Sequence, residues 1–244
     1  DDNYLRDSVF LGSGFDGIGQ DHLVLPKENV VPIPDNIPDE IAVLAELCSV
    51  SVHAIERVKD SLHKGKVAVF GDGPVGYLTA AALHGIYQIP RSELIVFGAV
   101  EEKLAQFDFA TTHPVQDFDF GRESGVVTIF ECTGGRFSES AINQAIDLSE
   151  PQGKIVLMGV SEDRAPVYTS NVLEKGLTLY GSSRSSAKEF IKLMEAFQNE
   201  SYQKTLRKIL PATIDLVHNE TELKEVMDRA AQHRSWEKII LRFA

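Results

Sequence analysis

The sequence predicts an α/β fold built on a doubly wound, parallel β-sheet. Through the middle of its 244 residues, short apolar runs alternate with segments of helical periodicity. These runs are continuously apolar, whereas a strand with one face in water alternates apolar and polar residues. A glycine-punctuated turn also joins the first run to the helix after it. Together, the three observations favour strands that are buried on both faces and connected by helices.

Residues 9–34 are predicted to form turns and short strands ahead of that sheet. The apolar segments 22–26 (HLVLP) and 30–34 (VVPIP) are the expected strands, and the prolines in this stretch exclude a helix. Residues 38–58 then have the pattern of a helix. Pro38 and Asp39 suit the start of this helix, because acidic side chains there interact favourably with the helix dipole.

The central part of the chain supplies the sheet and its connections. The predicted strands are 66–70, 94–98, 126–135, 153–162 and 177–185, and the predicted helices are 73–86, 101–109 and 138–149. From Ala187 the pattern changes, because a helix at 187–200 is followed by the shorter segments 209–217, 220–232 and 236–243. We expect these last segments to pack on something outside this sheet and its helices.

The composition narrows the class of protein. Lys and Arg total 24 against 36 Asp and Glu, a formal net charge of -12, so nucleic acid and anionic membranes are not expected partners. We find no apolar run long enough to span a bilayer and no signal-peptide layout. Cys48 and Cys132 make neither a disulfide framework nor a zinc-knuckle spacing, and we expect both to be small buried hydrophobes. A cytoplasmic enzyme is the simplest interpretation.

The sharpest motif follows the first strand of the sheet. Gly71, Gly73 and Gly76 have the G-x-G-x-x-G spacing, and Pro74 and Val75 lie within it, at the start of a helix. In a Rossmann-type fold the first glycine makes a tight turn, the second lets a pyrophosphate approach the backbone, and the third lets helix and strand pack closely. The alternative is a tight turn in some other α/β protein. The strand–turn–helix context favours a dinucleotide site.

The second strand bears on the choice of dinucleotide. An acid at its end would bond the ribose 2′-hydroxyl of NAD and repel the 2′-phosphate of NADP, but this strand ends at Gly98. The sequence therefore favours NADP(H) over NAD(H). Lys103 is the nearest cation, a turn into the next helix, and Glu101 and Glu102 lie in that helix rather than at the strand end.

Later strands end in small or polar residues where a cofactor would lie. In a doubly wound sheet, ligands bind at the carboxyl ends of the strands. The candidates here are Cys132, Thr133, Gly134, Gly159, Val160, Ser161, Ser183 and Arg184. Arg184 could pair with a phosphate group. Ordinary turns and a solvated arginine are the alternatives.

Several runs resemble one enzyme family, the zinc-dependent medium-chain alcohol and polyol dehydrogenases. They are AELCSVSVHA (45–54), GDGPVG (71–76), IFECTGG (129–135), VLMGVSE (156–162) and LEKGLTLYGSSRS (173–185). Within the family, the chain is most similar to the ribulose-5-phosphate reductases. That resemblance implies reduction of D-ribulose 5-phosphate to D-ribitol 5-phosphate by NADPH, for ribitol teichoic acid and CDP-ribitol synthesis. It also implies a Zn²⁺ ion that polarises the carbonyl.

The resemblance assigns roles to particular residues and segments. In this subgroup a Cys, a His-Glu pair and a later Glu bind the zinc, and only the last has a counterpart here, Glu46; the other ligands are expected upstream of Asp1. Residues 1–45 then correspond to the C-terminal part of a GroES-like catalytic domain, 46–186 to the Rossmann domain, and 187–244 to a segment that returns to the catalytic domain. Taken without the resemblance, Glu46 would be a solvated or capping acid. We expect His53 to be structural.

The resemblance also suggests partners. A sugar phosphate is the expected substrate, a homo-oligomer is expected through residues 167–181, and a cytidylyltransferase of the same pathway is a further possible partner. Three alternatives remain open. They are an NAD-dependent polyol dehydrogenase acting on an unphosphorylated substrate, a metal-free reductase of the same superfamily, and a dinucleotide-binding module without catalysis.

Overall fold

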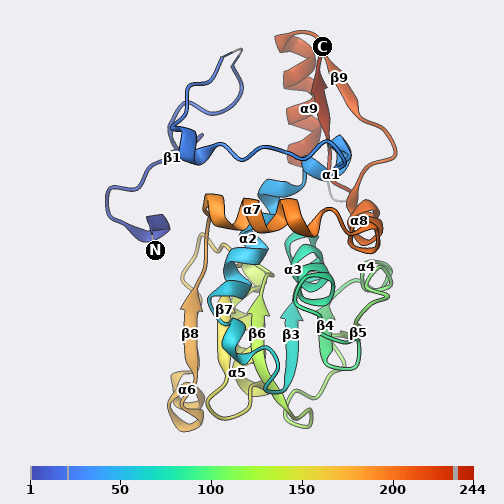
Figure 1. The fold of residues 1–244 in the computed structure, drawn as a ribbon. Helices are drawn as coiled ribbons and strands as arrows, with labels where there is room; N and C mark the ends of the chain where they lie inside the picture. Colours follow the sequence, from blue (N-terminus) through green and yellow to red (C-terminus); the bar gives the residue numbers. More distant parts are fainter. Residues whose placement is uncertain (1, 21, 233–235) are drawn as a thin grey trace.

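The fold was analysed in a computed structural model that describes residues 2–20, 22–232 and 236–244. Its centre is a six-stranded parallel sheet in the order β5-β4-β3-β6-β7-β8 (Figure 1). The strands are β3 (Lys66–Phe70), β4 (Leu94–Gly98), β5 (Thr111–Pro114), β6 (Val126–Glu131), β7 (Lys154–Leu157) and β8 (Thr178–Gly181). The chain winds outward from β3 in one direction and then from β6 in the other. This is the Rossmann order, with its crevice where the winding reverses, between β3 and β6.

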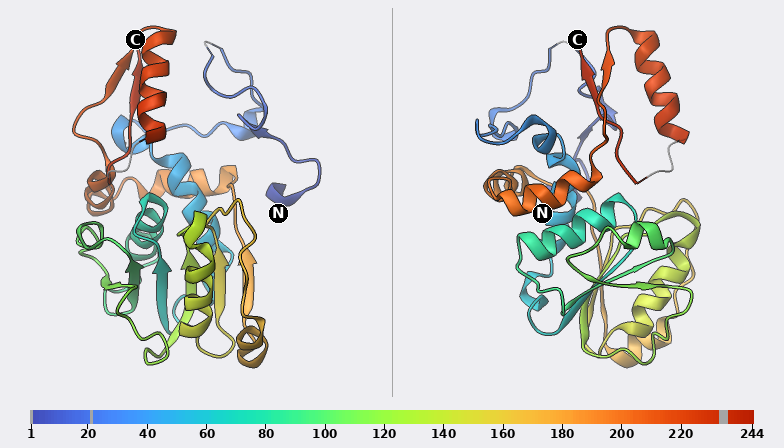
Figure 2. Two further views of the ribbon diagram at one scale, coloured as in Figure 1. Left: turned by 180° about the vertical axis from the view of Figure 1, so that it is seen from behind. Right: turned by 90° about the vertical axis from the view of Figure 1, so that its right-hand side faces the viewer.

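Helices cover both faces of this sheet (Figure 2). Alternate strand residues contribute to two separate apolar clusters, as Val67 and Val69 do on one face and Ala68 and Phe70 on the other. Helices α2 (Ala45–Glu56) and α3 (Pro74–Gly85) belong to the first cluster, and α5 (Ser138–Leu148) to the second. The continuous apolar runs of the sequence are explained by this burial on both faces.

The segment after β8 continues the same core. Helices α7 (Ala187–Ala196) and α8 (Glu200–Leu206) bury Leu193, Phe197 and Tyr202 in the cluster that contains α2 and α3. These two helices therefore belong to the core around the sheet, whereas the expectation of packing elsewhere concerns the segments 209–217, 220–232 and 236–243 that follow them. The division of the chain at 45 and 186 stays a prediction.

The C-terminal strand pair and its helix lie on the far side of α7 from the sheet (Figure 1). Strands β9 (Asp215–Val217) and β10 (Leu241–Phe243) form a parallel pair beside α9 (Glu220–Gln232). The N-terminal elements are η1 (Asp2–Tyr4), β1 (Phe10–Leu11), β2 (Gly14–Phe15), η2 (Lys27–Asn29) and α1 (Asp39–Ala42). Within the described ranges, none of the helices combines the length and apolar composition that crossing a bilayer requires.

Several elements differ from the sequence prediction. Residues 22–26 and 30–34 are not strands, although they are apolar, because no neighbouring strand pairs with them in the described structure. The helix expected at 38–58 is interrupted at Val43 and Leu44, and that at 101–109 shrinks to α4 (Glu101–Leu104). Strand β5 and helices α6 (Thr169–Lys175) and α8 were not predicted. Strand β5, at the sheet edge, has the sequence TTHP, which lacks the apolar run of a central strand.

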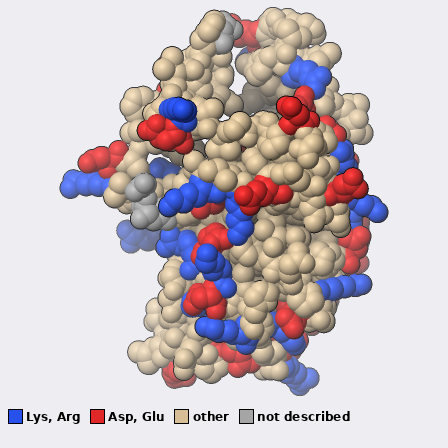
Figure 3. Space-filling view, viewed as in Figure 1, with Lys and Arg blue, Asp and Glu red and all other residues tan. Residues whose placement is uncertain are grey.

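A cluster around Glu56 joins α2 to α7. The Glu56 carboxylate accepts hydrogen bonds from Lys192 of α7, from Lys59 Nζ at 2.8 Å and from Tyr87 Oη at 2.7 Å. Acidic and basic side chains stand side by side on this face (Figure 3). Partial burial alone would raise the pKa of Glu56, but the hydrogen bonds outweigh it and lower the pKa to about 2.

This depressed pKa predicts how stability depends on pH. The contribution of Glu56 is fully present above its unfolded pKa, 4.5, and is lost as pH falls toward about 2. We expect Glu56→Gln to lower the free energy of unfolding at neutral pH and to flatten its decline between those values. Urea titrations across that range measure this. Asp119→Asn, which removes a mostly exposed carboxylate beside Arg122, is the control, and an equal flattening there would contradict the prediction.

Candidate functional site

The turn between β3 and α3 has a geometry that glycine alone supplies. Gly71 has a φ of +126°, which residues with a Cβ rarely adopt. A Cβ on Gly76 would lie 2.0 Å from the carbonyl oxygen of Gly71, so the turn closes tightly on the first turn of α3. Gly73 is the N-cap of α3, Pro74 is at its start, and a Cβ on Gly73 would meet nothing within 4 Å. The turn therefore leaves open space beside Gly73, at the amino end of a helix.

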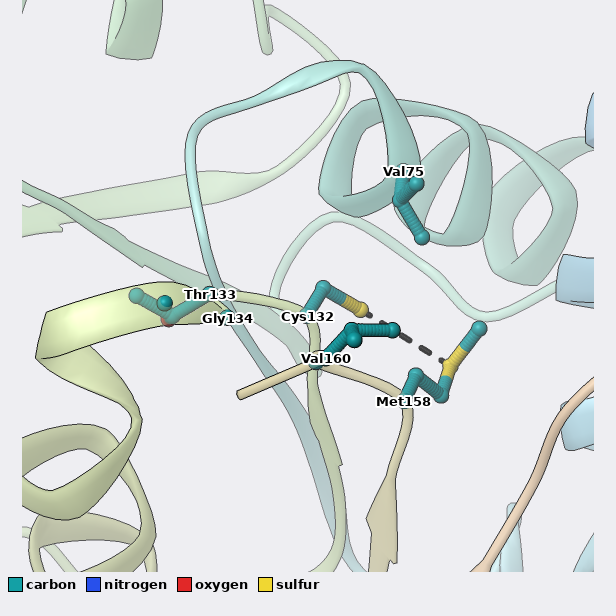
Figure 4. Close-up of a pocket in the computed structure, with 8 residues that line it drawn as sticks. Val75, Cys132, Thr133, Gly134, Met158 and Val160 are labelled. Carbon is teal, nitrogen blue, oxygen red and sulfur yellow. Dashed lines mark hydrogen bonds between the residues drawn. The ribbon is translucent and has the colours of Figure 1, made fainter. Parts of the chain in front are cut away.

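A cavity opens at the carboxyl ends of the strands beside this turn. Its volume is about 790 Å³, within the range of small-molecule sites. Its lining residues come from α3 and from the segments that follow β6 and β7; they are Val75, Cys132, Thr133, Gly134, Gly135, Met158, Gly159 and Val160 (Figure 4). The cavity lies at the winding reversal, where this fold binds ligands. It brings together six of the residues proposed from sequence to bind a cofactor.

The thiol in this cavity is not a candidate nucleophile. Burial raises the pKa of Cys132 to about 12, and its Sγ contacts Thr79 Oγ1 and Met158 Sδ, each at 3.8 Å. Cys48 is buried, whereas Cys132 is half-buried, and burial raises the pKa of Cys48 to about 12 as well. Both thiols are protonated at neutral pH. Cys48 is a small buried apolar group as expected from sequence, whereas Cys132 is not fully buried.

A carboxylate that sequence reasoning missed lies at the end of β4. Asp72 Oδ2 accepts hydrogen bonds of 2.7 Å from the backbone N–H groups of both Ala99 and Val100. A Cβ on Gly98 would lie 2.6 Å from the Asp72 Cβ, so the side chain of Asp72 occupies the space that an acid at Gly98 would need. The premise that no carboxylate stands at this strand end is thus wrong. This carboxylate belongs to the glycine turn after β3, so the residues that follow β4 in sequence could not predict it.

Other predicted cofactor residues do not line the cavity. Arg184 donates to Ser8 Oγ at 3.2 Å and to Asn3 O at 3.4 Å, and its guanidinium lies over the Phe10 ring. The Ser183 N–H donates to Tyr4 Oη at 3.1 Å. The N-terminal segment therefore contacts the end of β8.

Three more predicted residues lie outside the cavity lining. Ser161 Oγ donates to the Asp163 carbonyl at 2.9 Å, Lys103 is half-buried in α4, and Gly98 is buried at the end of β4.

Glu46, the predicted zinc ligand, is exposed in the first turn of α2. His53, on the same helix, is buried and lies 3.3 Å from Glu189 Oε1 through Nδ1, which links α2 to α7. Among the residues that the structure describes, no group of three or more His, Cys, Asp or Glu side chains is placed to hold a metal ion.

Comparisons with known proteins match the sequence and the fold of this chain. A family model described as zinc-binding dehydrogenase matches residues 95–199. Ribulose-5-phosphate reductase 1 of Staphylococcus aureus is 44% identical over 202 residues, which cover 80% of this chain and 57% of that protein. The enzyme named ribulose-5-phosphate reductase from Streptococcus pneumoniae is 36% identical over 211 residues, 86% of this chain and 60% of that protein. The chain thus spans a little more than half the length of these relatives.

Comparison with solved structures shows the same fold. The crystal structure of S. aureus TarJ in complex with NADPH superposes with a TM-score of 0.86 at 37% identity, covering 94% of this chain and 72% of that one. Galactitol-1-phosphate dehydrogenase from Escherichia coli gives a TM-score of 0.73 at 19% identity, covering 92% of this chain and 67% of that one, which shows the shared fold alone.

Proposed function

The chain belongs to the zinc-dependent medium-chain dehydrogenases, and from this premise we propose that it binds NADPH for the reduction of D-ribulose 5-phosphate to D-ribitol 5-phosphate. The product would supply ribitol teichoic acid and CDP-ribitol synthesis. The observation that carries the proposal is the glycine turn beside a cavity at the carboxyl ends of the strands, in a chain 44% identical to a ribulose-5-phosphate reductase. The match covers 57% of that relative, so the activity is proposed for the whole protein.

The residues of the cavity fit a dinucleotide. Gly73 offers the space in which a pyrophosphate can approach the backbone, and the start of α3 presents N–H groups and the positive end of the helix dipole. Val75 and Val160 supply apolar walls, and Gly134 lets the backbone approach a ligand closely. The bound dinucleotide would supply the hydride, while these residues orient it and exclude water from it.

The described residues do not by themselves fit a catalytic zinc ion. Glu46 is one carboxylate, whereas a catalytic zinc takes three protein ligands and one open position. The described residues do not complete such a site. The role of Glu46 as the one zinc ligand of this chain stays a prediction.

Assembly and location follow from the same proposal. Strand β8 is an edge of the sheet, and the exposed Leu173 and Tyr168 lie in the segment before it, so we propose that copies pair along this edge. A cytidylyltransferase is the proposed partner that consumes the product. The acidic net charge of -12 and a phosphorylated substrate support a cytoplasmic location.

Turnover tests the proposal directly. We expect protein made from its complete reading frame to oxidise NADPH with D-ribulose 5-phosphate, with kcat/KM at least about a hundredfold above that for D-ribulose, because a phosphate site left empty loses binding energy. NADPH absorbance measures the rate, NADH is the cofactor control, and a chelator tests the metal requirement. Faster turnover of an unphosphorylated polyol with NAD would favour the polyol dehydrogenase instead. Tight NADPH binding without turnover of any substrate would favour a binding module.

A further inference from the structure

The buried carboxyl group of Glu131 lies beneath the cavity and is absent from the proposed reaction. Glu131 is the last residue of β6 and has no exposed surface. Its Oε1 accepts a hydrogen bond of 2.7 Å from the Thr133 N–H, and its Oε2 has no hydrogen-bond partner in the described part of the chain. Burying a carboxyl group costs free energy, so its position between two loops indicates a specific role.

The two loops are the ones that line the cavity, 132–135 after β6 and 158–160 after β7. A Cβ on Gly159 would lie 2.7 Å from Glu131 Oε2 and 2.5 Å from the Gly134 nitrogen. Gly159 is therefore glycine because the carboxyl group and the neighbouring loop fill the space from inside. The loops also meet through the Gly135 N–H, which donates to the Val160 carbonyl at 2.7 Å.

The main chain of Glu131 holds the second loop as well. Its carbonyl oxygen accepts hydrogen bonds from the N–H groups of Met158 at 2.8 Å and Gly159 at 3.0 Å. One residue thus contacts both loops, the first through its side chain and the second through its backbone and the carboxyl group packed on Gly159. Burial raises the pKa of this carboxyl above its usual value, although the N–H groups of Thr133, Gly134 and Gly159 act in the opposite direction.

We propose that Glu131 is a positioning residue for the dinucleotide, whose carboxyl group sets the spacing of the loops 132–135 and 158–160. The role rests on the proposed function, because it assumes that a dinucleotide occupies the cavity these loops line. The group acts as a hydrogen-bond acceptor of fixed shape rather than as a charge. A residue of equal shape that retains the acceptor oxygen replaces it, and one that lacks the acceptor does not.

Two substitutions separate acceptor from volume. Glu131→Met keeps a similar volume but leaves the Thr133 N–H without its acceptor, and we expect the Kd for NADPH to rise at least about tenfold. The KM for NADPH should rise with it, while kcat at saturating NADPH stays within about threefold, because the loops are held by the bound cofactor. Glu131→Gln keeps the acceptor and should bind NADPH within about threefold of the unaltered protein.

The control is a half-buried carboxylate at the other end of the sheet that also accepts a backbone N–H. Glu150 Oε1 accepts 2.6 Å from the Gly125 N–H, directly before β6, so Glu150→Gln should leave the Kd for NADPH unchanged. Fluorescence titration gives the Kd, and thermal unfolding is recorded for every variant. A lower Tm for Glu131→Met with an unchanged Kd would reduce Glu131 to a structural role. Equal weakening by Glu131→Gln and Glu131→Met would also overturn the proposal.

Glu131→Asp covers the case in which the methionine variant does not fold. The shorter side chain keeps its charge but cannot reach the Thr133 N–H in the same way, so we expect at least about fivefold weaker NADPH binding. Binding equal to that of the unaltered protein would overturn the proposal. If the unaltered protein itself does not bind NADPH, the proposed function fails instead, so the two failures are distinguishable.

Discussion

Gly76→Ala is expected both to destabilise the protein and to weaken NADPH binding. The added Cβ would lie 2.0 Å from the carbonyl oxygen of Gly71, which is backbone and cannot rotate away. Either α3 moves off β3 or the glycine turn opens. We expect the free energy of unfolding to fall by at least about 3 kcal/mol, at the upper end of overpacking costs, and the Kd for NADPH to rise at least about a hundredfold. Urea unfolding and fluorescence titration measure the two effects.

Gly73→Ala is the matched control in the same turn. Its φ of -85° is open to any residue, and the added Cβ would meet nothing within 4 Å of the protein. The free energy of unfolding should therefore stay within about 0.5 kcal/mol, while NADPH binding weakens because the methyl group occupies the space proposed for the pyrophosphate. Unweakened binding in Gly73→Ala would place the pyrophosphate elsewhere. Unchanged stability in Gly76→Ala would contradict the geometry of the turn.

Asp72→Ser is expected to shift cofactor preference further toward NADPH. The carboxylate stands at the end of β4, where this fold places the adenosine ribose. A 2′-phosphate there would face a repulsion on the order of 1–4 kcal/mol, whereas a 2′-hydroxyl could donate to the same carboxylate. The ratio of kcat/KM for NADPH over NADH should rise at least about tenfold. Initial rates with each cofactor measure it.

Asp72→Asn separates charge from hydrogen bonding. Its side-chain oxygen can still accept from the Ala99 or Val100 N–H, but the negative charge is gone. We expect Asp72→Asn to show most of the change in the ratio of kcat/KM for NADPH over NADH. It should lower the free energy of unfolding less than Asp72→Ser does. If both variants keep the original ratio, the adenosine ribose does not lie beside Asp72.

Local sequence patterns were sufficient to predict the class of fold and the glycine turn at the centre of the site. A strand, a tight turn and a helix are adjacent in sequence, so the spacing of Gly71, Gly73 and Gly76 determines their geometry without help from the rest of the chain. The continuous apolar runs of β3, β4 and β6 result from burial of both faces of the sheet. The family resemblance came from the same segments.

Contacts between distant residues were decided only by the tertiary structure. Asp72 reaches the amides of Ala99 and Val100 because β3 and β4 are neighbours in the sheet, and the spacing after β4 could not indicate that. Arg184 follows a strand end as predicted, yet it contacts Asn3 and Ser8 rather than the cavity. The sequence by itself determined the central strands of the sheet and the glycine turn, since these depend on neighbouring residues. The tertiary structure decided which side chains meet, because that depends on strand order and on loops that join remote parts of the chain.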